Sequence, residues 1–159
     1  MSKLATIGYE SASLDDFITT LKKVGVEIIV DVRELAQSRR KGFSKKALSA
    51  ALELNGIDYI HLKGLGDPKE GRDAARSGDY RRFLQIFTDH LASEAAKADM
   101  QRAIEIATDS FACLLCYERS SKECHRRLVA DELSDKLNFE VMHVGVRHGI
   151  SGNGKARRA

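Results

Sequence analysis

Residues 27–32 read EIIVDV, a short stretch built around a continuous run of β-branched side chains. Such a run is typical of a strand that is buried on both faces of a parallel sheet. Further β-prone runs lie at 4–7, 58–62, 112–116 and 140–144, and amphipathic helical patterns lie at 13–24, 44–55, 80–92, 98–108 and 121–137. This alternation predicts an α/β fold: a single three-layer domain with a mostly parallel, five-stranded, Rossmann-like sheet and helices on both faces.

The length and the charge of the chain fit one domain. Its 159 residues are enough to bury a sound core. We predict a domain at 1–148, followed by a basic, glycine-rich and disordered tail at 149–159. The net charge is +3, and the three basic residues of this tail account for all of it. The neutral body argues against a dedicated nucleic-acid coat protein.

The sequence also indicates a cytoplasmic protein that does not enter membranes. No apolar run approaches the roughly 20 residues of a membrane span, and the first residues lack the apolar core of a signal peptide. The cysteines number three, and an odd number does not make the paired framework of a secreted protein. We therefore expect a reducing compartment.

Chemically active residues gather directly after the predicted strands. In an open α/β sheet, ligands bind beyond the carboxyl ends of the strands, and four strands deliver polar clusters to that edge. We predict one composite pocket there, with ligand-binding residues Gly8, Tyr9, Arg33, Ser38, Arg39, Gly64, Gly66, Cys116 and Arg126. The candidate catalytic residues are Asp31, Glu118, Cys124 and His125.

The stretch YERSSKECHRR connects the fourth predicted strand to a helix. Ser120 and Glu123 have the spacing of a capping box, which predicts Ser120 as the N-cap residue. The helical repeat then turns His125 and Arg126 toward the sheet, because they align with apolar residues one and two turns later. This end of the helix is therefore expected to form a wall of the pocket.

Two features favour an anionic ligand. An inward Arg126 needs a negative partner, either Glu118 or Asp31 or the phosphate or carboxylate of a ligand. The alternative is that an Arg126–Glu118 pair only attaches the helix to the sheet. The segment 33–46 carries six basic residues and one acid, which indicates either an anion site or a solvated loop.

The motifs resemble those of a known family. TIGYES at 6–11, DVRELAQSRRKGFS at 31–44, GIDYIHLKGLGDPK at 56–69 and LLCYERSSKECHRRLVADEL at 114–133 are similar to the bacterial and archaeal domain of unknown function 488 family. This family includes the YeaO-like proteins. The motifs come in the family's order, and the resemblance implies a compact α/β fold with a pocket lined by them. It implies no established reaction.

The chain departs from the family pattern at a few loop positions. Ala36 stands where the second motif usually has a proline, and Ser121 or Lys122 stands where the last motif usually has one. Asp67 replaces a glycine that often follows the third strand, which adds a carboxylate to the pocket or only makes a turn. The proline differences affect the stiffness of loops rather than chemistry.

A thiol-dependent reaction is one alternative mechanism. Rhodanese-like sulfurtransferases place a cysteine after a strand and need an arginine about five residues later, within a loop of free N–H groups. Here Ser121 lies five residues after Cys116, and counting from Cys124 leads into the predicted helix. The spacing does not favour this mechanism, and a buried cysteine is commonly only a packing residue.

A metal site is the second alternative. Cys116, Cys124 and His125 could supply soft ligands. Cys113 and Cys116 face opposite sides of a strand, and adjacent Cys124 and His125 point apart on a helix. We therefore predict no metal and no other cofactor.

Acid–base or electrostatic chemistry on a phosphate-bearing ligand uses most of these features. Arg33, Arg39 and Arg126 would bind the anion. Glu118, Asp31 or His125 would move protons. We predict an enzyme whose partner is a nucleotide or another phosphate-bearing small molecule, or a nucleic acid. The alternative from a different class is a non-catalytic nucleic-acid-binding or regulatory module that uses the basic residues of 33–46 and the tail.

Overall fold

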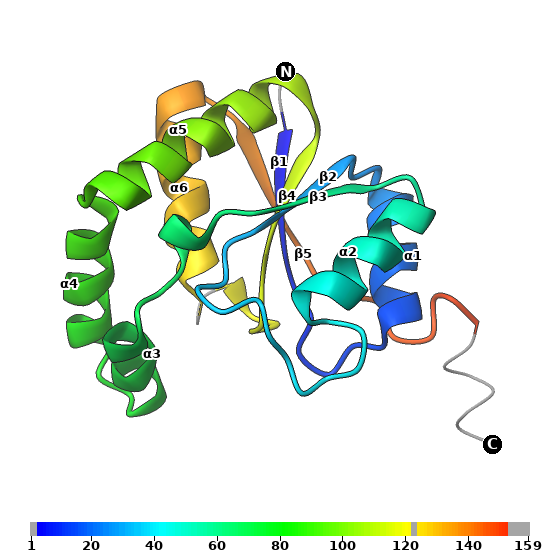
Figure 1. Cartoon of the computed structure of the whole chain (residues 1–159), viewed down its shortest axis with the longest axis horizontal. Coiled ribbons are helices and arrows are strands. Elements are labelled where there is room, and N and C mark those ends of the chain that lie inside the picture. Colours follow the sequence, from blue (N-terminus) through cyan, green and yellow to red (C-terminus); the bar gives the residue numbers. More distant parts are fainter. Residues whose placement is uncertain (1–2, 122–123, 153–159) are drawn as a thin grey trace.

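The predicted sheet is present in the computed structural model, which describes residues 3–121 and 124–152. Within these residues the strands are β1 (Lys3–Gly8), β2 (Ile28–Asp31), β3 (Asp58–His61), β4 (Ala112–Cys116) and β5 (Glu140–Val144). They lie in the order β3-β2-β4-β1-β5, and every pairing is parallel (Figure 1). The predicted α/β class is confirmed, with a sheet that is parallel throughout.

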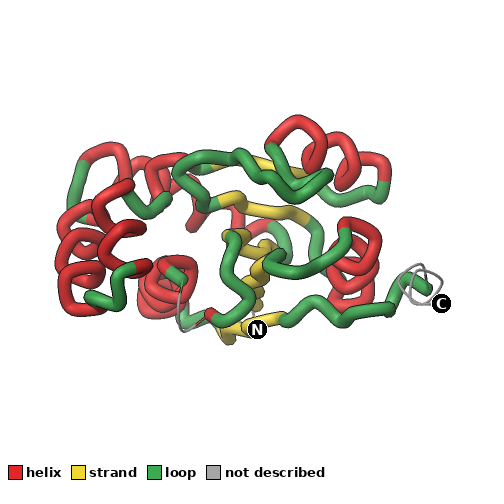
Figure 2. Tube along the Cα trace, turned by 90° about the horizontal axis from the view of Figure 1, so that it is seen from below, coloured by secondary structure: helices red, strands yellow, loops and turns green. Residues whose placement is uncertain are grey.

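Helices cover both faces of the sheet. Figure 1 shows α1 (Leu14–Val24) and α2 (Lys45–Leu54) on one side of it, and α3 (Lys69–Arg76), α4 (Tyr80–Leu91), α5 (Glu94–Asp109) and α6 (His125–Leu137) on the other. Figure 2 shows the same three layers from below. β4 serves both cores, because Cys113 and Leu115 pack toward α1 while Leu114 and Cys116 pack toward α6. None of the helices in the described segments is both long and apolar enough to cross a membrane.

The strand order creates a branch point at the carboxyl ends of β1 and β4. These two strands are neighbours, but the chain leaves β1 toward α1 on one face and leaves β4 toward α6 on the other. Ligands in open α/β folds usually bind at such a switch point. The two backbones approach closely there, since a Cβ on Gly8 would collide with the carbonyl group of Glu118. The N–H of Glu10 also donates to the carbonyl of Tyr117, at 2.8 Å.

Some predicted helix boundaries are wrong. The final helix begins at His125, and its N-cap is Cys124 rather than the predicted Ser120. The backbone of Cys124 is extended (φ −125°, ψ 142°). Glu123, the other member of the predicted capping box, lies outside the described residues. No helix is predicted between the β-prone run at 58–62 and the helical pattern at 80–92, but the structure has the 3₁₀ turn Lys63–Leu65 and α3 there. α3 forms because its small residues Gly71 and Ala74 pack inward although the segment is polar on average.

The start of the predicted C-terminal tail is held by Asp16 on α1. The carboxylate of Asp16 accepts hydrogen bonds from the N–H of Gly149 at 2.8 Å and from the N–H and hydroxyl of Ser151 at 3.0 and 2.7 Å. Burial alone would raise the pKa of Asp16, but these hydrogen bonds together with one from Ser13 lower it to about 2. Residues 149–152 therefore form a turn against α1, and 153–159 lie outside the described residues.

Replacing Asp16 tests this attachment. Asp16→Asn should lower the free energy of unfolding at pH 7 by about 2 kcal/mol, since the hydrogen bonds to a charged acceptor are lost. The pKa of Asp16 in the folded state is below its ordinary value of 3.8. Its stabilising effect is therefore fully present above about pH 4 and is lost as the pH falls through about 2. Urea unfolding at several pH values measures both effects.

Asp135→Asn is the matched control for Asp16→Asn, because Asp135 is an exposed aspartate on α6. This substitution should change the unfolding free energy by less than about 0.5 kcal/mol. Equal stability of the Asp16→Asn variant and the wild type at pH 7 would show that this attachment contributes nothing.

Candidate functional site

Arg126 on the first turn of α6 is the most unusual side chain of the strand-end region, because it is a fully buried cation. One terminal nitrogen donates to the carbonyl of Glu118 and lies 3.4 Å from the sulfur of Cys116. The other donates to the carbonyl of Arg119 at 3.2 Å. Its Nε has no hydrogen-bond partner among the described residues. Burial lowers the pKa of Arg126, although the charge of nearby Glu118 opposes this effect.

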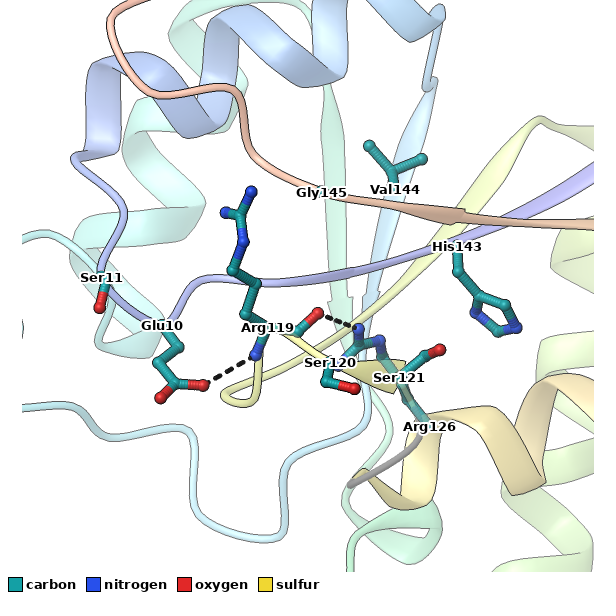
Figure 3. Close-up of a pocket in the computed structure, with 9 residues that line it drawn as sticks. All are labelled: Glu10, Ser11, Arg119, Ser120, Ser121, Arg126, His143, Val144 and Gly145. Atoms are coloured by element: carbon teal, nitrogen blue, oxygen red, sulfur yellow. Dashed lines mark hydrogen bonds between the residues drawn. The ribbon is translucent and has the colours of Figure 1, made fainter.

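A pocket of about 530 Å³ opens beside this guanidinium. It lies at the carboxyl ends of β1, β4 and β5, and Figure 3 shows its walls from three segments of the chain. The lining residues are mostly polar: Glu10, Ser11, Arg119, Ser120, Ser121, Arg126, His143, Val144 and Gly145. The carboxylate of Glu10 accepts from the N–H of Arg119 at 3.0 Å, which joins two of these lining segments. The pocket thus combines two guanidinium groups with three hydroxyls.

His143 contributes the wall formed by β5. Its Nδ1 lies 2.6 Å from the hydroxyl of Thr6, a buried residue on β1. Burial lowers the pKa of His143, and the positive charges of Arg126 and Arg127 lower it further. His143 is therefore neutral at neutral pH, so it adds a polar ring to the pocket rather than a charge.

Arg33 and Asp31, two predicted site residues, form a closed network elsewhere. Arg33 donates from Nε and from a terminal nitrogen to the two carboxylate oxygens of Asp31, at 2.9 and 2.7 Å. Its remaining nitrogen donates to the hydroxyl of Tyr9 at 3.2 Å and to the carbonyl of Phe43 at 2.7 Å. Tyr59 donates to the same carboxylate. Four of the five N–H groups of this guanidinium donate to the protein, and this network braces β2, β3 and the chain after β1.

The other predicted ligand-binding residues also lie away from the pocket. A Cβ on Gly66 would collide with the backbone of Glu34, and the N–H of Gly64 donates to the carboxylate of Asp99 at 2.7 Å. These glycines, like Gly8, permit close backbone approaches. The N–H of Ser38 donates to the hydroxyl of Ser44 at 3.0 Å, and Arg39 is exposed. Of the predicted ligand-binding residues, only Arg126 lines the pocket, and the roles of the others stay predictions.

Asp67 is a second unusual polar residue, and it interacts electrostatically with Arg72, Glu118 and Glu34. Asp67 is buried, and its Oδ1 has no hydrogen-bond partner among the described residues. Burial raises the pKa of Asp67 to about 7; the charge of Arg72 opposes this, while those of Glu118 and Glu34 add to it. Glu118 in turn places a carboxylate oxygen 3.5 Å from the sulfur of Cys116.

The comparisons with known proteins identify the family. The model of the family described as "Domain of unknown function DUF488" matches residues 13–133. The chain belongs to the DUF488 family. No curated protein and no solved structure matches it.

The sulfur atoms of this DUF488 chain are arranged differently from the prediction. Cys116 and Cys124 are joined in a disulfide, while Cys113 is a buried free cysteine on the opposite face of β4, as expected. Cys124 and His125 were expected to diverge, but the sulfur of Cys124 lies 3.7 Å from Nδ1 of His125. The prediction assumed that both residues are helical, whereas Cys124 is the extended N-cap. His125 is buried as predicted.

Sequence reasoning missed most of the pocket lining. Arg119, Ser120 and Ser121 line the pocket and stand inside the motif YERSSKECHRR, whose predicted site residues are its carboxylate, cysteine, histidine and second arginine. His143, within the predicted strand at 140–144, is not among the predicted site residues. The signal that could have found it is the end of the fifth strand, which lies at the same edge as the other four.

The pKa of Asp67 gives a measurable signature. Its value in the folded protein is above the ordinary 3.8, so the stability of the wild type falls as the pH rises from about 4 to about 7. Asp67→Asn has no charge to bury. It should therefore gain about 1–3 kcal/mol over the wild type between pH 4 and pH 8 in urea unfolding.

The control for this prediction is Asp73→Asn on α3, where the carboxylate is exposed and paired with Lys69. That variant should show no such gain as the pH rises. If the stability difference between Asp67→Asn and the wild type is the same at pH 4 and pH 8, the carboxyl group of Asp67 titrates normally.

Proposed function

We propose that the pocket beside Arg126 binds an anionic ligand, a nucleotide or a group derived from a nucleic acid, and that the protein is an enzyme. The observation that carries the binding proposal is the buried guanidinium with an unpartnered Nε next to a polar pocket.

A buried arginine is costly unless its charge and its N–H groups are satisfied. The hydrogen-bond partners of Arg126 within the described residues are backbone carbonyls and a sulfur, which leave most of its charge for another group. A phosphate is the natural complement, because its oxygens accept paired hydrogen bonds from a guanidinium. Arg119, Ser120 and Ser121 add donors around the same space. The start of α6 also favours a negative charge.

The proposal of an enzyme rests on Asp67. A carboxyl group with a pKa of about 7 is half ionised at neutral pH, so it can accept or donate a proton. Asp67 does not line the pocket, and its link to the pocket is electrostatic. The charge of Glu118 acts on Asp67, and a carboxylate oxygen of Glu118 lies 3.5 Å from the sulfur of Cys116, next to Arg126. Carboxyl groups with perturbed pKa values cluster at functional sites, which favours an enzyme.

Calorimetric titration with adenosine 5′-monophosphate tests the binding proposal. Two substitutions should each weaken nucleotide binding by about 10- to 100-fold: Arg119→Gln and Arg126→Lys. Arg119 is an exposed lining residue of the pocket, and Arg126 is a buried one. The reason is that each removes charge-assisted hydrogen bonds to the phosphate, worth about 1.5–3 kcal/mol. Circular dichroism checks that Arg126→Lys is folded.

Arg39→Gln is the matched control, because Arg39 is an exposed arginine outside the pocket. It should bind the nucleotide as the wild type does. If Arg39→Gln weakens binding and Arg119→Gln does not, the anion is bound by the basic segment 33–46 and the pocket proposal is wrong.

A separate experiment distinguishes an enzyme from a binding module. Nucleoside phosphates and short oligonucleotides are incubated with the wild type, and products are detected by mass spectrometry. Asp67→Asn should lower turnover, because it removes a carboxyl group that titrates near neutral pH, and nucleotide binding should be retained, because Asp67 does not line the pocket. Ligands that bind and are all recovered unchanged would favour the non-catalytic alternative.

A further inference from the structure

We infer that Cys116, Cys124 and His125 form a binding site for a thiophilic divalent cation, of which Zn²⁺ is the best match, when the two cysteines are reduced. The two sulfurs and a ring nitrogen of His125 all lie within 4.8 Å of one another, and all three residues are buried. Cysteine sulfur and histidine nitrogen are the preferred ligands of Zn²⁺.

The hydrogen bonding of His125 supports a ligand role. Its Nε2 lies 2.6 Å from the carbonyl oxygen of Val32, and because a carbonyl can only accept, Nε2 carries the proton. Nδ1 is then left with a free lone pair, and it is the nitrogen 3.7 Å from the sulfur of Cys124. Metal-binding histidines are oriented in this way by a backbone carbonyl on the far nitrogen. The ring of Phe87, 5.3 Å away, packs against the imidazole.

The backbone explains how neighbouring residues reach one ion. Two consecutive residues of a helix point apart, but Cys124 precedes the helix in an extended conformation. Its side chain makes no cap hydrogen bond, so the sulfur is directed elsewhere. Cys116 approaches from the end of β4. A strand end and a helix start therefore supply the three ligands.

The surrounding charges suit a bound dication. Metal binding replaces the protons of two thiols, which leaves two thiolates whose charge a divalent cation neutralises. Arg126 lies 3.4 Å from the sulfur of Cys116 and stabilises negative charge there. Glu118 has an oxygen 3.5 Å from the same sulfur but is not one of the three mutually close ligands, so a water molecule would complete a four-coordinate site.

The metal site and the disulfide are two exclusive states of the same pair. The disulfide has lost two electrons and two protons relative to the dithiol, and it has no thiolate to donate. A dithiol reductant returns both sulfurs to the thiol form and is itself oxidised to a disulfide. The Cα atoms of Cys116 and Cys124 are 7.4 Å apart, beyond the usual 4.4–6.8 Å of disulfides. An ion between the sulfurs spans this distance more easily than a direct bond.

The test uses the full chain, reduced with a dithiol that is then removed without air. It is titrated with Co²⁺, which shows near-ultraviolet thiolate charge-transfer absorption when cysteines bind it, and then with Zn²⁺. We expect one equivalent of Co²⁺ with this absorption and its displacement by Zn²⁺. Cys116→Ser, Cys124→Ser and His125→Gln should each weaken binding by more than the 10- to 100-fold typical of outer-shell changes.

Cys113→Ser is the matched control, since Cys113 is buried in the same strand but faces the opposite core. It should bind Co²⁺ as the wild type does. Absence of the charge-transfer band in the reduced, folded wild type would overturn the proposal. So would equal binding by Cys113→Ser and by the Cys116→Ser, Cys124→Ser double variant. The wild-type spectrum decides the question even where a variant does not fold.

Discussion

The burial of Arg126 is the constraint on which the strand-end region depends. Its guanidinium binds the carbonyls of Glu118 and Arg119, and these hydrogen bonds hold the chain after β4 over the end of β1. Gly8 makes this approach possible, because any larger residue would collide with the carbonyl of Glu118. This wall of the pocket therefore depends on a cation at the start of α6 that binds the backbone directly after β4.

The two buried arginines of the sheet edge differ in how completely the protein satisfies them. Arg33 has a carboxylate, a phenol and a carbonyl as partners, so its charge is neutralised by Asp31 and four of its five N–H groups are engaged within the protein. Arg126 has an unpartnered Nε and lines a pocket. Binding energy remains available only where the protein leaves a buried polar group incompletely satisfied. Arg33 comes directly after β2, and Arg126 lies on the helix that follows β4. Both therefore belong to the same sheet edge, and the sequence alone predicted the same ligand-binding role for each.

Local patterns predicted the fold class because β-branched runs and helical periodicity depend only on neighbouring residues. Strand order depends on long-range packing, which local patterns do not report. The pairing of β5 with β1, which brings His143 to the pocket, was therefore not predicted. The backbone of Cys124 was missed for another reason: a capping box at Ser120 predicted a helix there, while the helix starts later. The argument against a metal was that Cys124 and His125, as adjacent helical residues, point apart. Because the helix starts only at His125, that argument does not apply.

The anion pocket and the sulfur cluster meet at one side chain without sharing their other members. One terminal nitrogen of Arg126 is near Cys116, while the other is bound to the carbonyl of Arg119 on the pocket side. Cys124 and His125 do not line the pocket, and Arg119 contacts no sulfur among the described residues. Changes at these outer positions therefore perturb one site at a time. A substitution of Arg126 alters the charge beside both the anion pocket and the sulfur cluster. Its effect on one site is therefore interpreted by comparison with substitutions of Arg119, for the pocket, and of Cys124 or His125, for the cluster.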